Sequence, residues 1–306
     1  MTHAQVTDKH PGELSDVPGW FPPLDQMLFT WFLERQQNQG TRGDLLELGV
    51  YMGKSAILLG HHLQPGETFT VCDLFEGDAP DGANQAEAAK SYSALTRQAF
   101  ERNYLSFHDT LPTVIAAPSS VVSEHVAPGT CRFVHIDASH LYEHVYGDIG
   151  AAHDILQPGG VVVLDDFRSE HTPGVSVAAW EAVLNRGLRP VCLSTQKLYG
   201  TWGDPEPLQE ELLEMLRQRT DVGLSVQEAA GHRLIRTRSR GMKPPPFPTS
   251  RHYVAPVPAP APPAEVTEAR AARPARPAPS RARRLARDLL PPVITRALRR
   301  ARASRA

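Results

Sequence analysis

Hydrophobic and polar positions follow two periodicities along the first 240 residues. Short apolar runs that end in an acid or a glycine alternate with longer segments whose apolar residues recur every three or four positions. The short runs predict buried strands and the longer segments predict helices. Five strands that alternate with helices imply a parallel sheet with helices on both faces, a doubly wound α/β fold. The predicted strands are 44–49, 68–73, 113–117, 132–137 and 161–164, and the predicted helices are 24–38, one beginning after Gly53, 86–104, 142–156 and 175–186.

The pattern continues beyond the fifth strand and then stops. Residues 188–194 and 197–202 predict two further strands joined by a tight turn, 207–219 a surface helix, and 232–236 a last edge strand. We therefore expect a flexible N-terminus over 1–18 and a catalytic domain over 19–240. A Pro/Ala/Arg-rich stretch over 241–280 cannot bury a core and predicts a disordered linker. Residues 281–306 form a basic amphipathic tail.

The net charge of −2 conceals an asymmetry. Residues 265–306 contain 12 arginines and 3 acids, a balance of +9, so the rest of the chain carries −2 − 9 = −11. An acidic body argues against nucleic acid binding by the catalytic domain. The tail is either a contact for a membrane surface or an acidic partner, or simply solvated.

Cysteine usage and hydropathy indicate the compartment. The three cysteines form no C-x-x-C pair, and no run of 18 apolar residues or secretion signal is present. We expect a cytoplasmic protein with reduced thiols, peripheral to a membrane if the tail binds one. The sequence leaves a homo-oligomer open.

The most informative stretch is the corner from strand to helix at residues 44–55. It lacks the G-x-G-x-x-G fingerprint of dinucleotide-binding proteins. The spacing from Gly49 to Gly53-Lys54-Ser55 is one residue too short for a phosphate-binding P-loop, although an NTPase remains an alternative. The third interpretation is E-x-G-x-x-x-G, a cofactor loop in which glycines let a ligand approach the backbone closely.

Polar residues at the ends of the second and third strands complete a nucleoside site. Asp73 ends the second strand about twenty residues after the glycine corner, where an acid accepts both ribose hydroxyls. Ser119 follows the third strand and is a candidate contact for an adenine edge.

Three aspartates end the fourth and fifth strands. Asp137 and the pair Asp165-Asp166 lie 28 residues apart, and neighbouring parallel strands bring their ends within about 5 Å. Converging carboxylates predict a hard divalent ion, Mg²⁺ first, unless the aspartates only cap helices or strand ends. His140 follows Asp137 by three residues and is the candidate general base, because its pKa lies near neutrality.

Together these motifs resemble class I S-adenosylmethionine-dependent methyltransferases, and more narrowly the metal-dependent O-methyltransferases of the macrolide-sugar and catechol types. The resemblance implies a Rossmann-like seven-stranded sheet whose last strand is antiparallel. It also implies that Glu47, Gly49 and Gly53 hold the methionine part of the cofactor. The catechol type has a lysine where this chain has His140. The motifs are Glu47-x-Gly49-x-x-x-Gly53, Asp73-Leu-Phe-Glu-Gly77, Phe133-Val-His-Ile-Asp137-Ala-Ser-His140 and Gly160-Val-Val-Val-Leu-Asp165-Asp166-Phe167.

The resulting hypothesis is Mg²⁺-assisted O-methylation. The acceptor would be a hydroxyl of a sugar or another small polyol or natural product, as a free molecule or within a glycan. Asp137, Asp165 and Asp166 would hold the ion, while His140 removes the proton. Two alternatives remain, the P-loop-like NTPase and a non-catalytic cofactor-binding module that recruits partners through its basic tail.

Overall fold

One mixed sheet of nine strands organises the part of the chain that the structure describes. The structure is a computed structural model, and it describes residues 9–78, 82–83, 85 and 95–255. The strand order is β3-β2-β1-β4-β5-β7-β6-β9-β8. The strands are β1 Asp44–Leu48, β2 Phe69–Asp73, β3 Thr113–Ala116, β4 Cys131–Ile136, β5 Leu156–Leu164, β6 Arg189–Leu193, β7 Leu198–Thr201, β8 Val222–Ala229 and β9 His232–Ser239.

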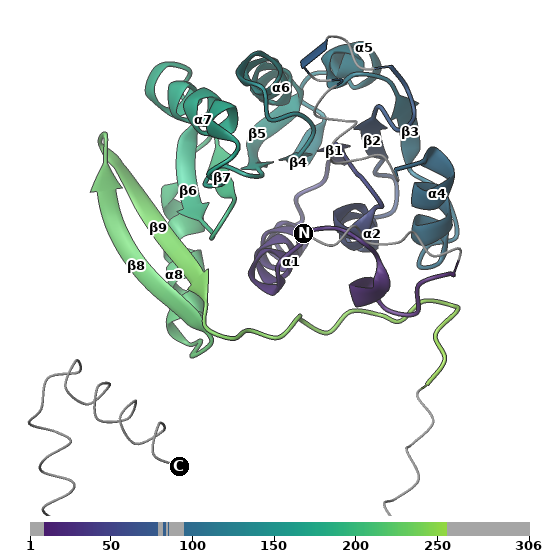
Figure 1. Cartoon of the computed structure of the whole chain (residues 1–306). Helices are drawn as coiled ribbons and strands as arrows, with labels where there is room; N and C mark the ends of the chain where they lie inside the picture. The colour runs from purple at the N-terminus through teal and green to yellow at the C-terminus, as the bar shows by residue number, and fades with distance from the viewer. Residues whose placement is uncertain (1–8, 79–81, 84, 86–94, 256–306) are drawn as a thin grey trace, which may run out of the picture. The chain divides into compact units, whose positions relative to one another are not determined.

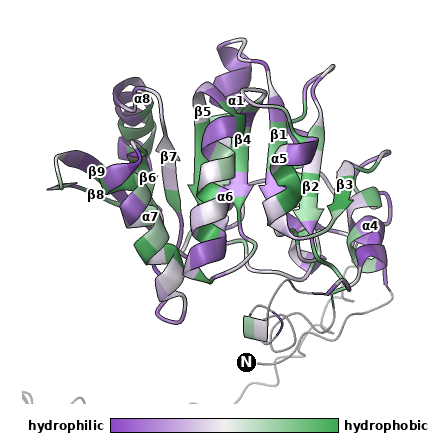
Figure 2. Cartoon of the chain, turned by 90° about the horizontal axis from the view of Figure 1, so that it is seen from above, coloured by the Kyte–Doolittle hydropathy of each residue, from purple (hydrophilic) through white to green (hydrophobic). Residues whose placement is uncertain are grey.

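Helices cover both faces of this sheet, and each face has its own hydrophobic core (Figure 1). Helices α1, α2, α4 and α8 pack on one face, and α5, α6 and α7 pack on the other. Seen in Figure 2, the parallel strands are mostly hydrophobic along their length. The helices are α1 Pro23–Asn38, α2 Lys54–His61, α4 Arg97–Leu105, α5 Val122–His125, α6 Tyr142–Ile155, α7 Pro173–Asn185 and α8 Glu206–Arg217, with short 3-10 turns η1 Leu14–Asp16 and η2 Ser119–Val121.

The sheet confirms the doubly wound α/β class. Strands β1 to β5 are parallel, and β7 runs antiparallel between β5 and β6, as the resemblance implied. The prediction of seven strands is wrong, because the β8–β9 hairpin extends the sheet through a parallel pairing of β9 with β6. The sequence missed β8 because only its first two residues, Val222 and Gly223, are buried, so no apolar run marks it.

Both ends of the described chain pack on the domain, which corrects two predicted boundaries. Residues 9–18 are not simply a flexible N-terminus, because Leu14 and Val17 are buried. Residues 241–255, predicted as linker, run back beside this segment (Figure 1). The Ser250 amide donates to the Gly12 carbonyl at 2.9 Å, and the Arg251 amide donates to the Ser106 carbonyl at 3.1 Å.

Some predicted segments lie outside the described residues. They include residues 86–94 of the predicted helix 86–104, the linker from residue 256 onward, and the basic tail. The later part of the predicted helix is described and corresponds to α4. Within the described residues, no helix combines the length and apolar character needed to cross a membrane.

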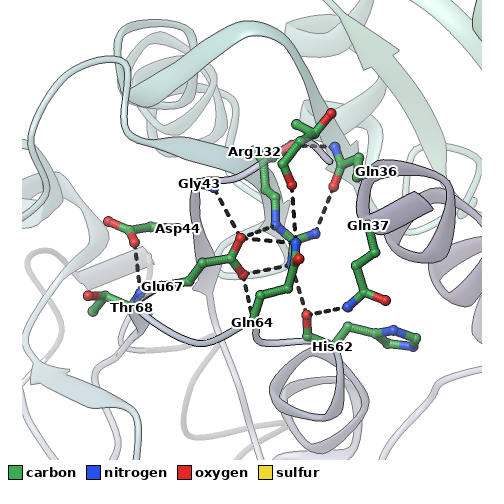
Figure 3. A network of polar contacts seen from close by, with 10 residues as sticks. Gln36, Gln37, Gly43, Asp44, His62, Gln64, Glu67, Thr68 and Arg132 are labelled. Carbon is green, nitrogen blue, oxygen red and sulfur yellow. Dashed lines mark hydrogen bonds and ion pairs between the residues drawn. The ribbon is translucent and has the colours of Figure 1, made fainter. Parts of the chain in front are cut away.

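A buried ion pair stabilises the sheet at the amino-terminal ends of its parallel strands (Figure 3). Arg132 is fully buried and contacts both carboxylate oxygens of Glu67, at 3.0 and 2.9 Å. It also donates to the Gln36 side chain of α1 and to the His62 carbonyl that follows α2. Arg132 therefore joins β4, α1 and the α2–β2 connection, and its own charge is compensated where water cannot reach it.

We predict that Arg132→Met lowers the free energy of unfolding by about 3–5 kcal/mol, because it leaves the Glu67 carboxylate buried without its partner. Urea titration followed by circular dichroism measures this loss. Arg97→Met, which removes an exposed ion pair with Glu101, is the matched control and should cost less than about 1 kcal/mol. Equal losses in the two variants would contradict the assigned role of Arg132.

Candidate functional site

The glycines of the cofactor loop serve packing as much as ligand approach. A Cβ at Gly49 would lie 2.1 Å from the Asp137 carbonyl oxygen, and a Cβ at Gly53 would lie 2.9 Å from the Phe100 ring. Both glycines also have positive φ angles, of 79° and 89°. The prediction that they leave room for a ligand therefore needs correction at Gly53, whose open side faces α4.

A cavity of about 540 Å³ lies at the carboxyl ends of β1 to β4, beside α6. It brings together four of the predicted site residues, Gly49, Asp73, Ser119 and Asp137. Its other lining residues include Tyr51, Cys72, Leu74, Phe75, Leu95, Ala117, Pro118, Ser120, Ser123, Ala138, Ser139, Glu143, His144, Tyr146, Asp148, Asp154 and Arg186, whereas Glu47, Gly53, His140, Asp165 and Asp166 do not line it.

Asp73 is held by the loop that it faces. One of its carboxylate oxygens accepts from the amides of Val50 and Tyr51, at 2.7 and 3.1 Å, and the other accepts from the Phe75 amide at 2.8 Å. Burial raises its pKa. The oxygen that accepts only from Phe75 keeps a second lone pair, so Asp73 can order the cofactor loop and still accept a ligand hydroxyl through that oxygen.

A second carboxylate, which the sequence analysis missed, shares the cavity with Ser119. Asp148 lies on α6, is 3% exposed, and accepts a hydrogen bond from Ser119. Burial raises its pKa to about 6. Its Oδ2 is buried and has no hydrogen-bond partner among the described residues. A helical acid among small residues gave no strand-end signal, which is why the motif search did not find it.

Glu47 does not have the position that was predicted for it. Its side chain is fully buried on the face of the sheet that α1 covers, where Oε1 accepts from Ser55 and contacts Nδ1 of His135 at 2.7 Å. Glu47 and His135 are cross-strand neighbours on β1 and β4. Glu47 therefore joins β1, α2 and β4 and does not reach the cavity that would hold the cofactor.

The contacts of the Lys54 and Ser55 side chains test the P-loop alternative. Lys54 Nζ donates to the Gly19 carbonyl at 3.4 Å, and Ser55 Oγ donates to Glu47. In a P-loop the same two residue types contact phosphate and magnesium. Both side chains are thus directed to protein partners, which disfavours a nucleotide phosphate site.

Strands β4 and β5 bring the three predicted aspartates together, but a lysine lies among them. Asp137 and Asp165 share a hydrogen bond, and Lys197 Nζ forms an ion pair with Asp165. Burial and the neighbouring Asp165 charge raise the pKa of Asp137 well above its usual range. Burial also acts against the charge of Asp165, but Lys197 outweighs it and the pKa of Asp165 is lowered.

Asp166 and His140 form a second, more open pair. His140 Nε2 lies 3.0 Å from Asp166 Oδ2, and the two side chains are 19% and 22% exposed. Asp166 also accepts from Ser169. These hydrogen bonds outweigh burial and lower the pKa of Asp166 to about 2. Asp166 has a positive φ of 51°, a rare conformation for a non-glycine residue and one that is concentrated at functional sites.

The donor set fits a divalent cation, although not as the predicted triad. Ligand atoms of Asp137, His140 and Asp166 all lie within 4.8 Å of one another, and the three residues are part-exposed. Asp165 instead belongs to a group with His135 and Asp137, and Lys197 lies against it. The carboxylates that fit a cation are therefore Asp137 and Asp166.

The pH dependence of stability tests whether the Glu47 side chain is buried. Burial raises its pKa to about 8, so from about pH 5 to pH 8 the folded chain holds a proton that the unfolded chain has released. The stability contribution of Glu47 therefore falls as the pH rises through this window. We predict that the free energy of unfolding of Glu47→Gln, relative to that of the unmutated protein, increases from pH 5 to pH 8. Urea titrations measure it, with the exposed Glu34→Gln as control; parallel pH profiles would refute the placement.

Part of the chain is similar to a known family of domains. Residues 46–167 match the family model described as a methyltransferase domain. A search of the curated proteins gives no match.

Solved structures that match part of the chain include the O-methyltransferase NovP, at 20% identity over 59% of this chain and 81% of that one, with a TM-score of 0.47. Another is the O-methyltransferase TomG from Streptomyces achromogenes, involved in tomaymycin synthesis and solved in complex with SAM, at 19% identity over 71% of this chain and 77% of that one, with a TM-score of 0.33. A third is an O-methyltransferase from Bacillus cereus in complex with SAH, at 19% identity over 71% and 80% of the two chains, with a TM-score of 0.35.

The matched segment begins within β1 and contains β2 to β5, the glycine loop, Asp73 and the three aspartates, which are the elements that carried the resemblance. Residues 46–167 of the chain are therefore similar to a methyltransferase domain.

Proposed function

We propose that the chain transfers the methyl group of S-adenosylmethionine to a hydroxyl oxygen of a sugar or another small polyol, with assistance from Mg²⁺. The observation that carries this proposal is the juxtaposition of Asp137, His140 and Asp166. Asp137 lines the cavity and also belongs to the candidate ligand group, so it lies at the boundary between the two halves of the site.

The cofactor half would be formed by the cavity. Asp73 would accept a ribose hydroxyl through its Oδ1, and the backbone at Gly49 would border the methionine part. Ser119 with Asp148 would contact the adenine edge. The buried Oδ2 of Asp148 supports this assignment, because an unsatisfied carboxylate oxygen is costly unless a donor such as an amino group reaches it.

The acceptor half would be formed by His140 and Asp166. Asp166 is ionised at neutral pH, since its pKa is lowered to about 2, and it holds the His140 ring at 3.0 Å. His140 would take the hydroxyl proton while the acceptor oxygen bonds to the methyl carbon and the carbon–sulfur bond breaks, which releases S-adenosylhomocysteine. Alignment of the two reactants would supply much of the rate.

Asp137 and Asp166 are the residues that would hold Mg²⁺. When bound, the ion would lower the pKa of the acceptor hydroxyl. Mg²⁺ is usually bound through one or two carboxylates and completes its shell with water and substrate oxygens. That requirement favours an acceptor with two adjacent oxygens, such as a sugar diol. A histidine in place of the lysine of the catechol type favours a polyol over a catechol.

Two further expectations remain proposals. A non-catalytic module that recruits partners is the alternative function, and it predicts cofactor binding without turnover. For the basic tail we propose contact with a membrane surface or an acidic partner, testable by comparing vesicle sedimentation of the full chain with that of a chain ending at residue 255. The vesicles should contain anionic lipid, and equal sedimentation of the two chains would remove the tail from membrane binding.

We predict that Asp73→Asn weakens S-adenosylmethionine binding by about 10- to 100-fold, because charged hydrogen bonds are worth about 1.5–3 kcal/mol. Isothermal titration calorimetry measures the dissociation constant. Ser123→Ala, at another position that lines the same cavity, is the matched control. An unchanged dissociation constant in folded Asp73→Asn would remove Asp73 from the cofactor site.

We predict that Asp166→Asn lowers kcat by at least about 100-fold while cofactor affinity changes by less than about 3-fold, since Asp166 would act on the acceptor side alone. The assay follows methylated product by mass spectrometry on a panel of sugars and polyols, with Mg²⁺ or with a chelator. Asp154→Asn, a cavity carboxylate away from the strand ends, is the control. Comparable losses of turnover and of cofactor binding would contradict this division of the site.

A further inference from the structure

Lys197 is the only lysine that the structure, within its described residues, buries among the strand-end aspartates. It directly precedes β7, and the antiparallel pairing of Leu198 with Leu164 sets it opposite Asp165. Its side chain is 1% exposed. Nζ contacts Asp165 Oδ2 and lies 3.2 Å from Nε2 of His135.

Both oxygens of Asp165 are thereby engaged. Oδ2 faces the Lys197 ammonium, and Oδ1 accepts from the Asp166 amide at 2.7 Å. A divalent ion bound to Asp165 would have to displace the ammonium or lie close beside it. The burial of Lys197 makes this repulsion strong, because water does not screen it.

The neighbouring ligand group differs in its exposure and in its partners. Asp166 is part-exposed, as is His140, and its two carboxylate oxygens contact the Ser169 hydroxyl and the His140 ring rather than a buried ammonium. Asp137 and Asp25 add to the negative field of Asp165 around Lys197, and this field holds the ammonium in its buried position. The lysine thus divides three aspartates into one that is neutralised internally and two that face the acceptor side.

We propose that Lys197 is an internal cation that withholds Asp165 from metal coordination and sets the affinity of the site for a divalent ion. It leaves a site of two carboxylates, Asp137 and Asp166, whose coordination is completed by oxygens of the acceptor. This inference deepens the proposed function and rests on its acceptor half. Its consequence is that the ion binds weakly to the protein alone and more tightly together with the acceptor.

The test measures Mn²⁺ affinity by electron paramagnetic resonance on the full chain without acceptor. Mn²⁺ serves as the probe for a site of carboxylate ligands. We expect Lys197→Met to bind Mn²⁺ at least about 10-fold more tightly than the unmutated protein, because Asp165 becomes available and the repelling charge is lost. The double variant Lys197→Met with Asp165→Asn should return to within about 3-fold of the unmutated protein. Unchanged affinity in folded Lys197→Met would overturn the proposal.

A second comparison does not require Lys197→Met to fold. Asp165→Asn should change Mn²⁺ affinity by less than about 3-fold, whereas Asp166→Asn should weaken it by at least about 10-fold. Equal losses would show that Asp165 is a ligand and would overturn the proposal. Lys54→Met is the matched control, because Lys54 lies on α2 and donates to Gly19. Circular dichroism verifies the fold of each variant.

The outcome separates this inference from the proposed function. S-adenosylmethionine binding and product formation are measured on the same samples. If the unmutated protein shows neither, that result counts against the proposed function alone. If the unmutated protein binds no Mn²⁺ and Lys197→Met does, Lys197 excludes the ion, which supports the inference while removing Mg²⁺ from the mechanism. If neither binds it, the inference is wrong.

Discussion

Compensation of negative charge at one edge of the sheet is the constraint on which the site depends. Parallel strands deliver their carboxyl ends to the same edge, and here β4 and β5 deliver Asp137, Asp165 and Asp166. Buried carboxylates that converge must be protonated or neutralised. Here burial and the Asp165 charge raise the pKa of Asp137, and the Lys197 ammonium faces the Asp165 carboxylate and lowers its pKa. The antiparallel entry of β7 is what brings that lysine to the correct edge.

The same lysine connects the strand-end aspartates to a buried polar layer under α1. Lys197 contacts His135, His135 contacts Glu47, and Glu47 accepts from Ser55 at the start of α2. The Phe29 ring of α1 packs edge-on against His135 and excludes water from this layer. These contacts join β1, β4, the start of α2 and the residue before β7, so the layer fixes the glycine loop and the strand-end aspartates relative to each other.

The sequence predicted the alternation of strands and helices, and the strand-end acids, because both are local in the chain. Asp73 and Asp137 line one cavity as expected, since the carboxyl end of a strand is set by the strand itself. Lys197 and Asp148 escaped prediction because their roles depend on pairing and packing between distant segments: a strand register for the lysine and a helix face for the aspartate. Glu47 shows the reverse case, a motif residue whose position in the strand turns it away from the cavity and into the core.

The division among the aspartates also explains why a single edge can serve both rigidity and reaction. Asp165, held by Lys197 and by the Asp166 amide, is fixed on both oxygens and cannot follow a reacting group. Asp166 is part-exposed, ionised, and bonded to a histidine that is also part-exposed. In the proposed function His140 is the proton acceptor, which needs an oriented ring in a water-accessible position, and the contact with Asp166 would orient that ring. Adjacent residues in the chain thus have different environments, because Asp165 meets the lysine before β7 and Asp166 meets His140.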